Sequence, residues 1–267
     1  MAKPPMHRAR KRFGQNFLHD HNIIDRIVGS IQPTAEQHLV EIGPGRGAIT
    51  EPLLERTGGH LDVIELDRDL IPILRTQFFR HKGLNIHEAD ALLFDFRQLA
   101  IDERPLRLVG NLPYNISTPL MFHLLTYSDI IKDMHFMLQK EVVQRLCAAP
   151  GDNAYGRLGI MMQYHCEAHF LFTVPAGAFN PPPKVESAIV RLTPRKTPKY
   201  HADNFSLFEK VVKASFAQRR KTLKNNLKGI LDDSGFAALE LNPGVRAETQ
   251  PIRRFVDIAN YVNSQKR

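Results

Sequence analysis

Apolar residues recur along the chain in short runs that alternate with helix-like patterns. Helical spacing is shown by Ile23, Ile24, Ile27, Val28 and Ile31, which predicts an amphipathic helix. Short apolar runs predict strands at residues 38–43, 61–67, 85–90, 107–111 and 133–139. Helical segments separate these strands, an alternation typical of a mostly parallel, doubly wound α/β sheet.

The later part of the chain predicts two further strands and a helical region. Edge strands are expected within residues 170–174 and 185–192, and helices within residues 205–231 and 252–262. Residues 193–204 are polar and contain prolines, which favours a linker. We therefore expect a large α/β domain at residues 1–196, with a basic N-terminal arm at residues 1–19, and a small helical domain at residues 197–267.

Composition narrows the class of protein. The 267 residues are 43% hydrophobic and 24% charged, which is typical of a globular chain with a sizeable core. Two cysteines form no disulfide framework and favour a reducing compartment. The chain has no apolar run of about 20 residues and no secretory h-region, so we expect a cytoplasmic protein without a membrane partner. A net charge of +8 suits a polyanionic partner.

A glycine-rich turn follows the first predicted strand of the sheet. Gly43, Gly45, Gly47 and Ala48 match the pattern G-x-G-x-x-G/A, and Glu65 ends the next strand. Such a turn approaches a nucleotide closely while the acid accepts ribose hydroxyls. The pattern fits a dinucleotide or S-adenosylmethionine equally well, and a turn without a ligand is a third interpretation.

Two further polar residues end predicted strands. Asp90 could accept the amino group of a cofactor adenine, although a helix N-cap explains it as well. Asn111 ends the fourth strand. Ligands of open α/β sheets bind at the carboxyl ends of the strands, so Gly43, Glu65, Asp90 and Asn111 predict one binding rim.

The stretch Asn111-Leu112-Pro113-Tyr114 suits methyl transfer to an aromatic amine. The Asn111 side chain and the Leu112 carbonyl supply two acceptors for the amine hydrogens, which would aim the nitrogen lone pair at a methyl group. Pro113 fixes the turn, and Tyr114 offers a stacking face. A β-turn with Tyr114 packed on the sheet is the alternative. Ser117 is expected to cap the following helix.

A second aromatic wall is predicted at Phe179, which precedes three prolines. A base has to leave its stack to enter an enzyme pocket, and Phe179 could cover its other face. A structural phenylalanine before a proline-rich turn is the competing interpretation.

Taken together and in order, six motifs resemble the ribosomal RNA adenine dimethyltransferases. They are FGQNFL, EIGPG, VIELD, GNLPYNISTPL, FNPPPKV and FAQRRKT. The resemblance is strongest to the bacterial small-subunit branch, in which loss of the enzyme is linked to kasugamycin resistance. It implies a seven-stranded, Rossmann-like methyltransferase sheet with a small helical domain. It also implies S-adenosylmethionine-dependent N6,N6-dimethylation of two adjacent adenines in a hairpin loop near the 3′ end of 16S rRNA.

The resemblance also assigns residues. It implies cofactor contacts at Asn16, Leu18, Gly43, Glu65, Asp90 and Asn111. It implies catalytic roles for Asn111, Leu112 and Tyr114, and target-base contacts at Pro113, Tyr114 and Phe179. It implies a monomer that acts without a metal on 16S rRNA in an assembling small subunit.

A basic run from Lys210 to Lys228 predicts contact with RNA phosphates, above all at Arg219, Arg220 and Lys221. A solvated helix face is the ordinary alternative. His165, Cys166 and His169 resemble metal ligands but lack a fourth partner at the usual spacing, which favours packing.

Four other functions fit parts of the pattern. An assembly factor without chemistry would not need the amine acceptors of Asn111 and Leu112. A large-subunit methyltransferase of the macrolide-resistance type shares the rim, but the longer motif matches favour the small-subunit enzyme. A nicotinamide dehydrogenase lacks a hydride-acceptor site here, and DNA adenine methylases more often carry an acid-led amine loop.

Overall fold

The computed structural model describes residues 15–265, and these form two compact units. The first comprises the described residues up to Val143 together with His169–Pro194. The second comprises Gln144–Ala168 and the described residues from Arg195 onward. Contacts thus join residues 144–168 to the helical part of the chain, whereas the sequence placed them in the α/β domain. The predicted boundary between residues 196 and 197 stays a prediction, and residues 1–14 of the basic arm lie outside the described residues.

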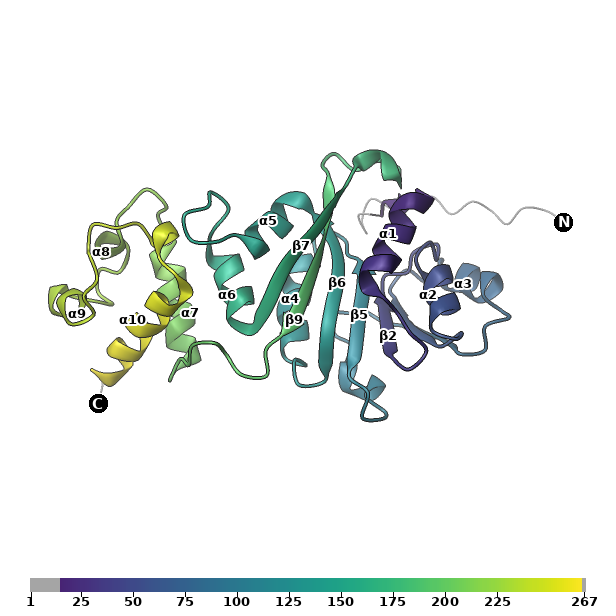
Figure 1. Cartoon of the computed structure of the whole chain (residues 1–267), viewed down its shortest axis with the longest axis horizontal. Helices are drawn as coiled ribbons and strands as arrows, with labels where there is room; N and C mark the ends of the chain where they lie inside the picture. The colour runs from purple at the N-terminus through teal and green to yellow at the C-terminus, as the bar shows by residue number, and fades with distance from the viewer. Residues whose placement is uncertain (1–14, 266–267) are drawn as a thin grey trace. The chain divides into compact units, whose positions relative to one another are not determined.

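A seven-stranded sheet forms the centre of the first unit (Figure 1). Its order is β4-β3-β2-β5-β6-β9-β7; the pairings from β4 to β6 are parallel, and β9 is antiparallel to β6. The strands are β2 (His38–Ile42), β3 (Leu61–Glu65), β4 (Leu84–Glu88), β5 (Leu106–Asn111), β6 (Ile131–Gln139), β7 (Cys166–Val174) and β9 (Ser187–Pro194). The predicted mostly parallel α/β sheet is confirmed.

The expectation of two edge strands was half wrong. Strand β7 lies at the edge, but β9 lies between β6 and β7. Residues 187–190 are all buried, as befits a strand covered on both faces and paired on both sides. A buried apolar run does not by itself reveal its neighbours, because strand order depends on long-range pairing.

Helices and short elements complete the first unit. They are β1 (Phe17–Leu18), α1 (His21–Ile31), α2 (Thr50–Arg56), α3 (Ile71–Gln77), η2 (Phe96–Leu99), α4 (Ser117–Leu125), η3 (Ala176–Ala178) and β8 (Phe179–Asn180). Helix α5 (Lys140–Cys147) begins in the first unit and ends in the second. The amphipathic helix predicted around residue 27 is α1, and the Asp20 side chain caps it by accepting from the backbone N–H groups of residues 22 and 23.

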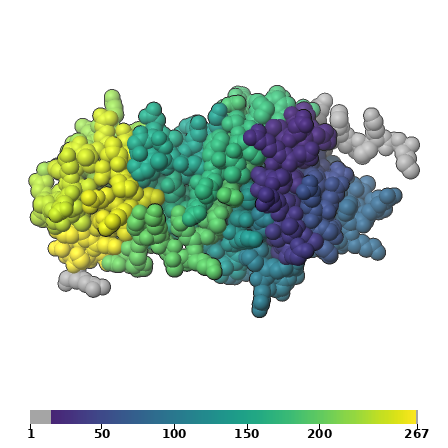
Figure 2. Space-filling view, viewed as in Figure 1, coloured from purple at the N-terminus to yellow at the C-terminus, as the bar shows by residue number. Residues whose placement is uncertain are grey.

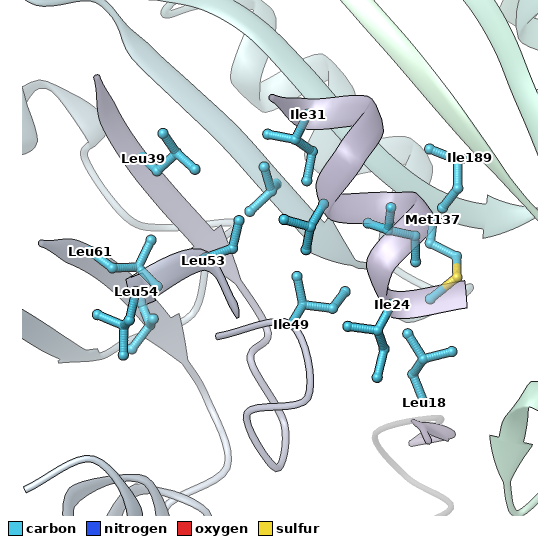
Figure 3. Packing of buried hydrophobic residues seen from close by; sticks show 14 of the residues in the cluster. Leu18, Ile24, Ile31, Leu39, Ile49, Leu53, Leu54, Leu61, Met137 and Ile189 are labelled. Atoms are coloured by element: carbon cyan, nitrogen blue, oxygen red, sulfur yellow. The ribbon is translucent and has the colours of Figure 1, made fainter. Parts of the chain in front are cut away.

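One hydrophobic cluster of the first unit packs α1 and α2 against a face of the sheet (Figure 3). Ile24 and Ile31 of α1 belong to this cluster together with Met137 of β6 and Ile189 of β9 (Figure 3). Ile31 is the last residue of α1, and its carbonyl accepts a hydrogen bond from the Arg107 guanidinium at 2.7 Å. Arg107 also forms an ion pair with Asp133 at 2.9 Å. These contacts hold α1, and the segment that precedes it, at a defined place on the sheet.

The second unit is helical and has its own core of Tyr155, Phe208, Phe236 and Phe255, among others. Its elements are α6 (Arg157–His165), α7 (Phe205–Ser215), α8 (Leu223–Asn226), α9 (Asp233–Ala238), η4 (Ala247–Thr249) and α10 (Ile252–Ser264). Within residues 15–265, no helix combines the length and the apolar character that crossing a membrane requires.

The helical character expected within residues 205–231 is divided between two helices, α7 and α8, because the chain leaves the first helix after Ser215. The Asn226 side-chain amide donates to the carbonyls of Ser215 and Gln218 at 2.8 and 3.1 Å. Carbonyls that lose their helical partners are thus satisfied by one side chain. The loop from residue 216 to 222 carries the FAQRRKT motif.

Candidate active site

One pocket opens at the carboxyl ends of β2, β3 and β5, where the rim was predicted. The structure brings together all the predicted cofactor and target-base residues of the α/β domain along its wall. They are Asn16, Leu18, Gly43, Glu65, Asp90, Asn111, Leu112, Pro113, Tyr114 and Phe179. Arg219, Arg220 and Lys221 belong to the second unit. The individual roles of these residues remain predictions.

The glycine-rich turn uses its own donors within the protein. The Gly45 N–H donates to Glu65 Oε2 at 3.2 Å, and the Gly47 N–H donates to the Pro44 carbonyl at 2.8 Å. Gly47 has a φ of +81°, and a Cβ there would lie 2.6 Å from the Phe78 ring. Only glycine fits this position, and the occupied donors make the turn poorly suited to a pyrophosphate.

Glu65 is held in a fixed orientation at the end of β3. Its Oε1 accepts from the Asp67 N–H at 2.8 Å, while Oε2 accepts from Gly45. Burial raises the pKa of Glu65, although these backbone donors act against the shift. Each carboxylate oxygen has a second lone pair, so the group can still accept from a ligand hydroxyl.

Glu41 is a pocket residue that the sequence analysis missed. It is 2% exposed in β2, lines the pocket and accepts from Thr50 Oγ1 at 2.6 Å. Burial raises the pKa of Glu41 to about 7, against the opposing hydrogen bond of Thr50. The hydrogen bond spans the glycine-rich turn, because Thr50 is the first residue of α2. In the sequence, Glu41 could have been noticed as the acidic residue that begins the EIGPG motif.

The segment that contains Gln15, Asn16 and Leu18 crosses the rim and touches several strand ends. Asn111 Nδ2 donates to the Asn16 carbonyl at 3.2 Å, and Gln15 Nε2 donates to Asp67 Oδ2 at 2.8 Å. Leu18 pairs with Phe179, so that β1 and β8 form a small antiparallel sheet. Figure 2 shows this purple N-terminal part of the chain against the green stretch that contains β8.

The Arg46 guanidinium lies 4.6 Å above the Phe17 ring centroid and adds a contact between this segment and the glycine-rich turn. Gln15, Arg46 and Asp67 were not singled out from the sequence, because their role depends on contacts between distant segments.

The Asn111–Tyr114 turn has a backbone fixed from two sides. The Leu112 N–H donates to the Met137 carbonyl at 3.2 Å. Ser117 was expected as a helix cap, which was wrong: it is the first residue of α4, and its hydroxyl donates to the Tyr114 carbonyl at 3.2 Å. Because a carbonyl only accepts, the contact with Asn16 identifies the nitrogen end of the Asn111 amide and leaves Oδ1 as its acceptor end.

Asp90 and Phe179 were each interpreted either as a ligand contact or as a structural residue, and the structure is consistent with both roles. Asp90 lines the pocket, and its Oδ1 also accepts from the Leu92 N–H at 2.9 Å, as a turn acid does. Phe179 lines the pocket, yet is 3% exposed and belongs to the core. Each structural role fixes the residue at the rim and is compatible with a ligand contact.

Within residues 15–265, no group of three His, Cys, Asp or Glu side chains is arranged to hold a metal ion. Cys166 is fully buried at the start of β7, and burial raises the pKa of its thiol to about 12. A thiol with so high a pKa is a poor metal ligand and a poor nucleophile at neutral pH.

A family profile described as "Ribosomal RNA adenine dimethylase" matches residues 6–264 of the chain. The chain belongs to this family. "Ribosomal RNA small subunit methyltransferase A" of Chromohalobacter salexigens is 60% identical over 264 residues, which cover 97% of this chain and 93% of that protein. The protein of the same name from Pseudomonas putida is 54% identical and covers 100% of this chain and 99% of its own length.

Two solved structures show the same fold at lower identity. A dimethyladenosine transferase from Plasmodium falciparum has a TM-score of 0.78 and 24% identity, covering 94% of this chain and 98% of that one. The 23S rRNA methyltransferase ErmE has a TM-score of 0.73 and 23% identity, covering 93% and 100%. Family and fold agree, and the chain is an rRNA adenine dimethyltransferase. The alternatives of a dehydrogenase and of a pure binding protein are thereby set aside.

Proposed function

We propose that this enzyme uses S-adenosylmethionine to dimethylate the N6 groups of two adjacent adenines in a hairpin loop near the 3′ end of 16S rRNA. The names and high identity of the small-subunit relatives support this substrate over a large-subunit one. The observation that carries the chemistry is the orientation of Asn111, whose amide oxygen and the neighbouring Leu112 carbonyl are two acceptors on one turn at the pocket.

These two acceptors match the two hydrogens of an adenine N6 amine. Accepting both of them withdraws the nitrogen lone pair from the ring and aims it away from the base plane. Tyr114 and Phe179, on the same pocket wall, supply aromatic faces for the flipped base. The methyl group comes from the sulfonium of the bound cofactor, and the amine loses one proton to water for each methyl that it gains.

The acids of the rim match the chemistry of S-adenosylmethionine, which carries a sulfonium and an ammonium charge. Glu65 is placed to accept ribose hydroxyls and Asp90 to accept the adenine amino group. Leu66 and Ala91 follow these acids and line the same pocket, so they offer apolar contacts for the adenine ring. Glu41 adds a carboxyl group beside the glycine-rich turn, where a cationic methionine end would be favoured.

RNA binding is assigned to the loop that carries Arg219, Arg220 and Lys221, all of which are exposed. The rest of the proposal is that the enzyme acts as a cytoplasmic monomer on an assembling small subunit. By leaving only after methylation, it would also mark that stage of assembly.

Methyl transfer to isolated small subunits tests the proposal. Subunits from a strain that lacks this modification should accept labelled methyl groups from S-adenosylmethionine, up to four per particle if two adenines are dimethylated. Mapping by mass spectrometry should place the label on adjacent adenines. Labelling of the large subunit alone, or no labelling where a related enzyme works, would overturn the proposal.

A further inference from the structure

The hydroxyl groups of Tyr114 and Ser187 lie 2.8 Å apart. Tyr114 belongs to the turn after β5, whereas Ser187 is the first residue of β9, 73 positions later in the sequence. Either hydroxyl can donate to the other. This contact reaches the end of the Tyr114 side chain and leaves its backbone untouched.

The backbone of the turn does not depend on this contact. The Leu112 N–H is held by the Met137 carbonyl, and the Tyr114 carbonyl accepts from Ser117 Oγ. The Tyr114 ring remains able to turn about its two side-chain torsions, because these bonds act only on the main chain. The hydroxyl lies on the axis of the second torsion, so the contact with Ser187 restricts the first torsion and thereby fixes where the ring lies.

Ser187 is itself a rigid anchor. It is 1% exposed and pairs with Gln139 in the ladder between β6 and β9. Just before it, the Lys140 N–H donates to the Glu186 carbonyl at 3.0 Å, and the side chains of these two residues form an ion pair at 2.8 Å. The position of the Ser187 hydroxyl is thus set by the sheet and not by a loop.

We propose that Ser187 is a positioning residue for methyl transfer, because its hydroxyl fixes the place of the Tyr114 ring on which the target adenine stacks. This inference rests on the proposed function and extends it to a residue that touches neither cofactor nor base. The place of the ring sets where the N6 amine meets the acceptors of Asn111 and Leu112. A ring that turns freely still offers an apolar face, but it holds the amine in line with the methyl group for less of the time.

The consequence is selective. Loss of the hydroxyl contact lowers the rate of the chemical step and weakens stacking of the base. It leaves cofactor affinity unchanged, because neither hydroxyl is needed for the glycine-rich turn or for the Glu65 contacts. When the target amine is misplaced in this way, the rate of methyl transfer falls by about 10- to 100-fold.

A double-mutant cycle tests the proposal. Ser187→Ala and Tyr114→Phe remove the same hydrogen bond from opposite ends, so each should lower the single-turnover rate by a similar factor. The double variant should be no slower than the slower single variant. Ser215→Ala, which removes another fully buried serine hydroxyl in the second unit, is the matched control and should keep the wild-type rate.

Two further readouts separate positioning from mere stability. With 2-aminopurine in place of the target adenine, both single variants should show weaker quenching on binding, since stacking is looser. Ser187→Thr restores a hydroxyl and should recover most of the rate and the quenching. Cofactor affinity, measured by calorimetry, should stay within about twofold of wild type in all variants.

Additive rate losses in the double variant would overturn the inference, as would full activity of Ser187→Ala. If Ser187→Ala fails to fold, Tyr114→Phe removes the same bond and still decides the matter through its rate and quenching. Failure of the proposed function would look different, because the wild-type enzyme itself would then transfer no methyl group to the small subunit.

Discussion

Asn111 Nδ2 donates to the backbone carbonyl of Asn16 at 3.2 Å. Asn16 lies in the segment before α1, and Asn111 is the last residue of β5. The N-terminal segment therefore orients the amide at the carboxyl end of β5. Because the acceptor is a main-chain carbonyl, the side chain of Asn16 is not needed for this orientation.

Replacing Asn111 with alanine should abolish most methyl transfer, because one of the two amine acceptors is lost. We expect single-turnover rates to fall by about 10²- to 10³-fold with an unchanged melting temperature. Asn16→Ala is the matched control: it retains the carbonyl, so it should weaken cofactor binding more than it slows the chemical step. Equal rate losses in both variants, at saturating cofactor, would contradict these separate roles.

Glu41 should make the stability of the first unit depend on pH. Its pKa is about 7 in the folded chain, against an ordinary value of 4.5. Below pH 4.5 the carboxyl is protonated in both states and costs nothing. As the pH rises to about 7, the unfolded state releases this proton first, so the free energy of unfolding falls by on the order of 3 kcal/mol.

Glu41→Gln removes the titration and retains an acceptor for Thr50. The stability of this variant relative to wild type should increase from pH 4.5 to about 7 and then remain level. Urea unfolding at several pH values measures the difference, and Glu55→Gln on the exposed face of α2 is the matched control. A constant difference between Glu41→Gln and wild type across this range would refute the prediction.

Phe179 should contribute separately to folding and to RNA binding. Phe179→Ala leaves a cavity in the core and should lower the free energy of unfolding by about 3–5 kcal/mol. Phe179→Leu keeps much of the packing against Leu18, at a cost of about 1.5 kcal/mol or less. It removes the aromatic face, however, and should raise the Kd for a hairpin RNA by roughly 5- to 150-fold, as expected for one lost stacking contact. Wild-type RNA affinity in a folded Phe179→Leu variant would show that this side chain is only structural.

In the basic loop of the second unit, Arg219 should contribute to stability as well as to RNA binding, whereas Arg220 and Lys221 should contribute to RNA binding alone. Arg219 donates to the Asn153 carbonyl and to Glu248 Oε2, so Arg219→Ala should lower the melting temperature. Replacing Arg220 and Lys221 together with alanine should instead leave stability unchanged and weaken RNA binding. The slope of log K against log salt should become shallower by roughly 1.4 to 1.8, which corresponds to two lost phosphate contacts. An unchanged slope would place the RNA contact elsewhere.

The pattern of the sequence was informative where the physical cause is local. Buried parallel strands read as short apolar runs, and glycine occurs where the turn requires a positive φ, as at Gly47. The acids and amides that end successive strands were expected on one rim, because parallel strands present their carboxyl ends at one edge. For these reasons Gly43, Glu65, Asp90 and Asn111 could be grouped before the pocket was known.

The pattern failed where a residue acts through a distant partner. The break after Ser215 depends on Asn226, eleven positions away, and the place of β9 depends on its pairing with β6 and β7. Glu41 looked like one more strand residue until its burial and its bond to Thr50 were known.

The sequence by itself determined the sheet, the glycine-rich turn and the residues proposed as acceptors for the target amine, because each leaves a signature within a few positions. Only the tertiary structure decided how the parts are oriented: which way the Asn111 amide faces, what covers the rim, and which hydroxyl holds the Tyr114 ring. The physical reason is that a hydrogen bond such as that between Tyr114 and Ser187 joins segments 73 positions apart. No local pattern encodes such a contact, and it exists only once the strands have paired.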